Sequence, residues 1–215
     1  KSFEENGLYG FILISFISLL TNFFFPLSTL INTIIFIILL LMIIKYDFFK
    51  QSKIKLLKYS LLIALLSFIL IVHANVNNPD ALLYHLPYSK IINENKIIIG
   101  IANVHHRFAH ISIFQYISSF FNIIFFNEKG LLIPISILTS FFFLYLFRQF
   151  NSLFKKEIYR ASSYIIFLIL IISVYSFSRY SNFGNDAQVH IYYFLLIVLI
   201  FSFNFVYKNN FFLKK

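Results

Sequence analysis

The sequence LYGFILISFISLLTNFFFPLSTLINTIIFIILLLMII (residues 8–44) contains no charged residue. A helix needs about 20 mainly apolar residues to cross a hydrocarbon core roughly 30 Å thick. At 37 residues the stretch approaches the length of two crossings, and FFPLS (residues 24–28) is a Pro-containing turn that separates its two halves. The second half is short for a span, so tilt or snorkelling of flanking charges would make up its length. We predict a hairpin of two transmembrane helices in this part of the chain.

The whole chain has the composition of a membrane protein. Hydrophobic residues make up 60% of its 215 residues, 31 residues are phenylalanine and only 12% are charged. Its mean hydropathy of +0.82 lies outside the usual balance of a soluble globular domain. Because the sequence has no cysteine, disulfides and thiolate metal sites are excluded within it.

Further apolar runs resemble the first, and together they predict six transmembrane helices. Glu4 and Glu5 precede the first run and no small-residue cleavage site follows it, so we do not expect a removable signal peptide. The predicted fold is an all-α polytopic bundle that forms a single transmembrane domain over residues 1–215. Its predicted spans are residues 8–25, 30–44, 59–72, 131–147, 161–178 and 187–207.

Basic residues gather in three segments that flank these runs. Residues 45–58 hold five of them, residues 148–160 hold four, and the tail from Lys208 holds three. Basic flanks are retained on the cytoplasmic side of a membrane. We therefore expect both termini to be cytoplasmic, with residues 73–130 forming a large loop on the outer face.

The formal net charge of +10 then belongs mostly to the inner flanks of the spans. Since these charges lie against apolar runs rather than in a separate basic domain, they do not indicate nucleic-acid binding. Lipid headgroups are the expected partners of these side chains.

All six histidines and four of the eight acids fall on the outer side in this topology. Polar and apolar residues alternate at helical intervals in residues 88–99 and 105–126, which predicts two juxtamembrane helices in the headgroup layer. Residues 111–126 are also apolar enough to re-enter the membrane, and charge counting does not separate these two interpretations.

The segment NNPDALLYHLPY (residues 77–88) follows the third apolar run directly. Asp80 stands after a proline, where a carboxylate commonly caps a helix. Tyr84 and His85 come one helical turn later, and with Asp80 they form a cluster able to accept a proton and hydrogen-bond a polar ligand. Both roles are compatible.

His105, His106 and His110 recur at short spacing, and His106 and His110 would share one helix face. A divalent metal site is conceivable, but no carboxylate stands at a fixed spacing, so we favour hydrogen bonding or interfacial packing and expect no cofactor. Arg107 lies beside them on the side where arginine is disfavoured. Either a phosphate-like anion or a lipid headgroup would explain it.

The last outer segment repeats this pattern on a smaller scale. Asn185 and Gln188 match a capping box at the start of the sixth span. Asp186 and His190 are four residues apart and would share a helix face near the membrane surface, where ionisable groups are functional candidates. Neutralisation of Asp186 by Arg179 is the competing explanation.

The segment DALLYHLPYSKIINENKIIIGIANVHHRF (residues 80–108) resembles the first periplasmic loop of bacterial GT-C glycosyltransferases, and GNDAQVHIYYF (residues 184–194) is similar to a second outer segment in some relatives. These integral membrane enzymes transfer a sugar from a polyprenyl-phosphate donor. The resemblance implies that Asp80 is the general base for the acceptor. It also implies a bacterial inner-membrane location, with an active face that is periplasmic or extracellular.

By the same resemblance, Tyr84, His85 and Arg107 would bind donor or acceptor, and Arg107 would meet the phosphate. From their position on the predicted outer side, His106, Asp186 and His190 are further candidates for substrate binding. Family members are usually longer, so we expect this chain to be a fragment or truncated member. A transporter or flippase of envelope precursors is the alternative from another functional class, and a non-catalytic membrane subunit is the third. The spans carry no charges at their centres, which favours surface chemistry over transport.

Overall fold

The structure is a computed structural model that describes residues 2–45, 53–72, 81–109, 112–155, 160–176 and 186–212. Every described element is helical, so the all-α prediction is confirmed for this part of the chain. The longer helices are α1 (Phe3–Phe24), α2 (Thr29–Lys45), α3 (Lys53–Val72), α4 (Leu86–Glu94), α5 (Ile113–Phe120), α6 (Ile133–Phe154), α7 (Arg160–Tyr175) and α9 (Asp186–Phe212). Four short turns complete them: η2 (Ala81–His85), η3 (Ile101–Asn103), η4 (His106–Ala109) and η5 (Asn127–Leu132).

A helix occupies each of the six ranges predicted to be spans. Within the described residues, two helical stretches, Phe3–Phe24 and Asn127–Phe154, are long and apolar enough to cross a membrane. The other four helices contain shorter apolar stretches, namely Thr29–Met42, Lys58–Val72, Ser162–Tyr175 and Asp186–Phe201. Length and composition thus identify two possible crossings, fewer than the six predicted from sequence.

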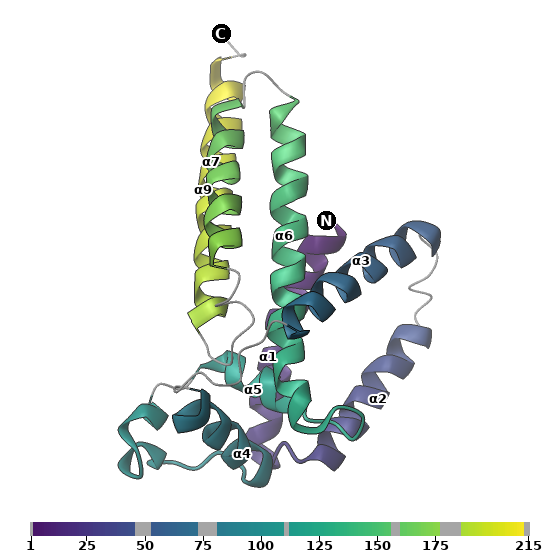
Figure 1. The fold of residues 1–215 in the computed structure, drawn as a ribbon, viewed down its shortest axis with the longest axis vertical. Coiled ribbons are helices and arrows are strands. Elements are labelled where there is room, and N and C mark those ends of the chain that lie inside the picture. The colour runs from purple at the N-terminus through teal and green to yellow at the C-terminus, as the bar shows by residue number, and fades with distance from the viewer. Residues whose placement is uncertain are drawn as a thin grey trace.

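Helix α6 lies at the centre of the bundle. It packs against α1, α3 and α7, while α7 and α9 lie side by side (Figure 1). Leu138, Phe142 and Leu146 are four residues apart along α6 and are completely buried. Because residues at this spacing share one helix face, they form the stripe on which the neighbouring helices close. The core therefore runs along α6.

Amide side chains connect α4 to the end of α1 and to the turn between α1 and α2 through hydrogen bonds. Asn22 of α1 is buried, and its Nδ2 donates hydrogen bonds to the carbonyls of Ile92 (3.2 Å) and Asn95 (3.0 Å). Asn93 of α4 donates to the carbonyls of Leu27 (2.6 Å) and Ser119 (2.9 Å). These bonds satisfy backbone groups at helix ends, where intrahelical partners are missing, and so fix α4 relative to α1.

The two predicted juxtamembrane helices are shorter than expected. Instead of residues 88–99, α4 covers Leu86–Glu94, and it ends because Asn95 adopts an extended backbone. Instead of one helix over residues 105–126, there are two separate elements, η4 and α5. Ser112 starts α5 with a capping box, and the Phe121 N–H closes it by donating to carbonyls of the last turn.

Candidate functional site

A cavity of about 480 Å³ opens between elements of the segment predicted to lie on the outer side and the start of α9. Its walls come from η2, from η4, from the residue before α5 and from the first turn of α9. The lining side chains are those of Tyr84, His85, His106, Arg107, Ser112, Asp186 and Val189. Five of the residues expected from sequence to bind a substrate therefore meet in one polar cavity, which we call the outer pocket.

Tyr84 and His85 end the short π-helical turn η2, and their rings lie 4.1 Å apart between centroids. Pro87 stands in the first turn of α4, which follows at once. Proline has no backbone N–H to donate, and it is tolerated where a new helix begins because first-turn N–H groups have no intrahelical acceptor. Wide π-helical turns are rare and occur often at functional sites. This turn presents both side chains to the outer pocket.

Arg107 reaches the outer pocket because its neighbour Phe108 is anchored. Phe108 is buried and packs on Tyr88 of α4, with ring centroids 5.6 Å apart. One helical turn before Tyr88, the ring of Tyr84 lies under Arg107, whose guanidinium carbon is 4.9 Å from the ring centroid. The backbone N–H of Arg107 also donates to Nδ1 of His105 at 3.2 Å. The two aromatic contacts align η4 with α4.

Tyr88 does not line the outer pocket but contacts Phe108 of η4 and Tyr116 of α5. Burial and a side-chain hydrogen bond with Tyr116 raise the pKa of its hydroxyl above the ordinary range of tyrosine. The group is therefore neutral at physiological pH. Its role is to hold η4 and α5 against α4.

His105 and His106 are adjacent in sequence but differ in their relation to the outer pocket. The His105 and His106 rings stack, with centroids 4.8 Å apart, and of these two only His106 lines the outer pocket. His110, the predicted partner of His106 on a helix face, lies outside the described residues. In the described part of the chain, no three His, Cys, Asp or Glu side chains are grouped to hold a metal ion.

Ser112 was missed by the sequence interpretation. Its hydroxyl accepts a hydrogen bond from the Phe114 N–H at 3.3 Å, and Gln115 completes the capping box that begins α5. Phe114 in turn packs on Phe11 of α1 and stacks on Tyr192 of α9. The Ser-x-x-Gln pattern at residues 112–115 was a signal for a helix start here.

The first turn of α9 supplies the acidic side of the outer pocket. Asp186 begins the helix, where a carboxylate is favoured by the helix dipole, and Val189 lines the outer pocket one turn later. His190 is half-buried on α9 and does not line the cavity, in contrast to the prediction. Ile191, Leu195 and Val198 are buried, so they define the face of α9 that packs in the core.

Asp80, the residue expected to act as general base, lies outside the described residues, as do Asn185 and Arg179. Asp80 immediately precedes η2, whose last two residues line the outer pocket. What the described side chains offer is one guanidinium, two imidazoles, a phenol, a hydroxyl and a carboxylate. This set suits a ligand that carries both negative charge and hydroxyl groups.

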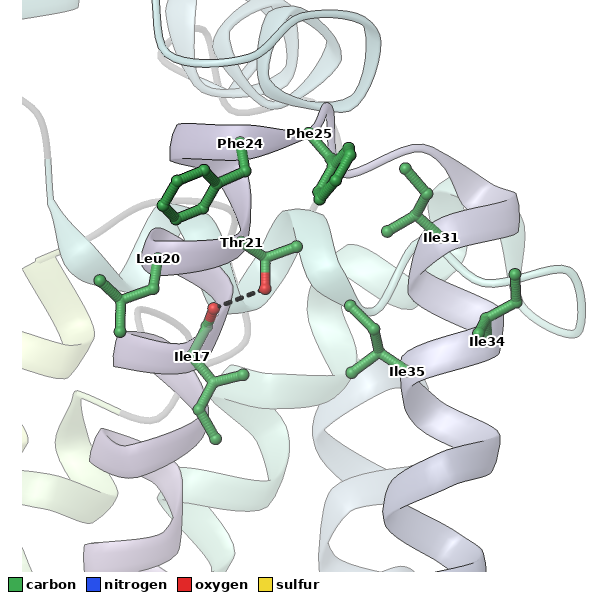
Figure 2. Close-up of a pocket in the computed structure, with 8 residues that line it drawn as sticks. All are labelled: Ile17, Leu20, Thr21, Phe24, Phe25, Ile31, Ile34 and Ile35. Carbon is green, nitrogen blue, oxygen red and sulfur yellow. Dashed lines mark hydrogen bonds between the residues drawn. The ribbon is translucent and has the colours of Figure 1, made fainter.

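A second cavity has the opposite character. Figure 2 shows an open groove of about 570 Å³ between α1 and α2, lined by Ile17, Leu20, Thr21, Phe24, Phe25, Ile31, Ile34 and Ile35. The Thr21 hydroxyl donates to the Ile17 carbonyl at 2.8 Å, so this polar side chain is satisfied within its own helix. The groove offers apolar contact and no titratable side chain, so of these two cavities the outer pocket is the candidate reactive site.

No curated protein and no solved structure matches the chain. One protein-family model matches almost the whole of it, over residues 1–213. That model is described as a domain of unknown function, and its match does not name a substrate or a reaction. The chain belongs to this family, DUF8201.

Proposed function

We propose that this protein is a membrane glycosyltransferase that moves a sugar from a polyprenyl-phosphate donor to a cell-envelope acceptor on the outer face of the bacterial inner membrane. The observation that carries the proposal is the outer pocket, which gathers Tyr84, His85, His106, Arg107 and Asp186 from segments far apart in sequence. A phosphate needs a cation, and a sugar needs hydrogen-bonding groups of both kinds. The outer pocket supplies both.

The arrangement of helices supports a multi-pass placement. Along the chain, α1, α2, α3, α6, α7 and α9 alternate in direction (Figure 1). In the described helices of this set, no charged residue lies in the central third. A six-span bundle with both termini cytoplasmic fits this alternation, and the outer pocket then opens toward the outer leaflet, where a lipid-linked donor presents its phosphate.

The proposed reaction is a single displacement with inversion at the anomeric carbon. Asp80 takes the proton from an acceptor hydroxyl as its oxygen forms a bond to the anomeric carbon of the sugar. The bond from that carbon to the phosphate oxygen breaks, and the polyprenyl phosphate leaves with the electron pair. Arg107 stabilises the charge that develops on the departing phosphate.

Transfer of radiolabelled sugar from a polyprenyl-phosphate donor to envelope extract, by the full-length protein in proteoliposomes, tests the proposal. Removal of a general base by Asp80→Asn is expected to slow transfer by about 10²- to 10⁴-fold. Glu94→Gln is the matched control, because Glu94 is an exposed acid of the same loop whose side chain is 60% exposed.

Transfer at the wild-type rate by Asp80→Asn would contradict the role of Asp80. A wild-type protein that binds no donor and transfers no sugar would contradict the function itself. Transport of intact donor across the proteoliposome membrane, with no product formed, would instead establish the flippase alternative.

A further inference from the structure

Three apolar side chains project from the segment that joins α4 to η4. Ile98 is 45% exposed, Ile99 is 96% exposed and Val104 is 80% exposed. Gly100 turns the chain between them with a φ of +83°, a conformation that side chains with a Cβ adopt only with strain. Ile101 points inward and is buried. We call residues 98–104 the apolar finger.

Hydrogen bonds fix the base of the apolar finger to the last turn of α1. The Ile97 N–H donates to the Asn22 carbonyl at 3.0 Å, and Asn22 Nδ2 donates to the Asn95 carbonyl at 3.0 Å. Asn22 is buried, so these bonds are shielded from water. The apolar finger therefore starts level with the end of α1, a helix that is long and apolar enough to cross a membrane.

The end of α1 exposes three apolar rings that suit contact with lipid. Phe23, Phe24 and Phe25 are 54%, 72% and 59% exposed. Apolar side chains this exposed at the end of a helix of membrane-spanning length suit contact with acyl chains. The base of the apolar finger is hydrogen-bonded to Asn22, which directly precedes these three phenylalanines. The base therefore lies at the same level as the exposed end of α1.

Charge distribution around the apolar finger favours a lipid surface over a protein partner. Lys96, just before the finger, is exposed, whereas the exposed Lys90 of α4 is paired with Glu94 at 3.9 Å. Cations beside exposed apolar residues match the phosphates and acyl chains of a headgroup layer. We propose that Ile98, Ile99 and Val104 insert into the outer leaflet, with Lys96 at the level of the lipid phosphates.

Insertion of the apolar finger into the membrane does not depend on the proposed transfer of a sugar. It has a consequence for the outer pocket, since the apolar finger connects its two walls. Tyr84 and His85 precede α4, and His106 and Arg107 follow the finger. A lipid-anchored finger fixes both walls at the membrane surface, within reach of a ligand whose apolar part stays in the bilayer.

The absence of cysteine from these 215 residues allows single-cysteine labelling of this chain in phosphatidylethanolamine–phosphatidylglycerol vesicles. Ile99→Cys and Val104→Cys would each carry an environment-sensitive fluorophore. Lys90→Cys is the aqueous control, and Leu13→Cys is the hydrocarbon control because Leu13 is 61% exposed near the middle of α1. Quenching by lipids with nitroxides on their acyl chains is compared with quenching by aqueous iodide.

The proposal expects blue-shifted emission at residues 99 and 104, with loss of intensity to nitroxides near the headgroups and little loss to iodide. Lys90→Cys should show the reverse. Iodide quenching at residue 99 equal to that at residue 90 would overturn the proposal, and so would protection from both quenchers, which indicates a protein partner. If residue 13 were also quenched only by iodide, the membrane placement itself would be wrong.

Discussion

The guanidinium carbon of Arg107 lies 4.9 Å from the centre of the Tyr84 ring, although the two residues belong to different elements, η4 and η2. The contact parallels that of the next residue, Phe108, with Tyr88 one turn further along α4. A guanidinium stacked on an aromatic face retains donors at its edge for a bound anion. The geometry presents Arg107 to the outer pocket in a defined orientation.

Replacement of Arg107 by alanine should weaken donor binding. A hydrogen bond to a charged group contributes about 1.5–3 kcal/mol, which corresponds to roughly a ten- to hundredfold loss of affinity. Equilibrium binding of radiolabelled polyprenyl-phosphate sugar to purified protein measures this effect. Lys96→Ala removes the same charge from an exposed position in the same loop and should change affinity little. Equal losses in both variants would mean that only net charge matters.

Asn22→Ala should destabilise the protein by about 1–3 kcal/mol, since it removes a buried amide that donates to the carbonyls of Ile92 and Asn95. The Ile92 carbonyl keeps the Leu27 N–H as its donor, whereas the Asn95 carbonyl loses this bond. For a chain of this size, each kcal/mol corresponds to a fall of about 2–4 °C in Tm, which thermal scanning in detergent detects. Asn95→Ala is the control, because the exposed Asn95 side chain makes one long bond of 3.3 Å to Ile91. Equal shifts in the two variants would show that the Asn22 bonds do not fix α4.

Replacement by alanine should have opposite effects on stability at Gly130 and at Gly10. A Cβ on Gly130 would collide with the backbone carbonyl of Phe121, so Gly130→Ala forces a backbone shift and should cost about 1–3 kcal/mol. A Cβ on Gly10 meets nothing within 4 Å, and alanine is the better helix former there by about 1 kcal/mol. Thermal scanning should show a lower Tm for the first variant and a higher Tm for the second. A rise for Gly130→Ala would contradict the tight η5 turn.

The ends of α1 and α6 are joined by an ion pair between Glu4 and Arg148, with Oε2 and Nη1 3.0 Å apart. The Glu4 side chain is only 3% exposed, so Arg148→Ala leaves a buried charge without its partner and should cost about 3 kcal/mol. The pair Lys90–Glu94 is exposed at both ends, and Lys90→Ala should cost less than about 1 kcal/mol.

Urea unfolding or thermal scanning ranks these two variants. The double variant Arg148→Ala with Glu4→Gln should recover part of the loss, because it removes the unpaired carboxylate. If the double variant is no more stable than Arg148→Ala, the pair does not stabilise the contact between α1 and α6.

The sequence predicted the helices well because charged and polar segments interrupt the apolar runs at intervals that a helix can fill. It also selected Tyr84, His85, His106, Arg107 and Asp186 as candidates, since polar residues in so apolar a chain are few, and the structure brings these five to one cavity. The lengths of α4 and α5 were wrong for a physical reason. Asn22 donates to the Asn95 carbonyl just after α4, and Ser112 starts α5 with a capping box. The helical periodicity of the sequence carries no information about either set of hydrogen bonds.

The choice between Val189 and His190 could not be made from sequence. Both lie within a turn of Asp186, and the rotation of α9 is set by packing of its apolar face on α6 and α7. Ser112 was not selected from the sequence because the mainly apolar run that follows it was interpreted as part of one longer helix. Local signals located the residues, and tertiary packing decided which of them share the outer pocket.

Occupancy of the outer pocket by a lipid-linked sugar can be measured directly with a photo-crosslinking amino acid placed at residue 189, which lines the cavity. The matched position is Tyr193, one turn along α9 and 61% exposed. The account predicts that radiolabelled polyprenyl-phosphate sugar is captured from residue 189, that unlabelled donor competes, and that Arg107→Ala reduces capture. Equal capture from residues 189 and 193, or capture from residue 189 that survives an excess of unlabelled donor, would contradict it.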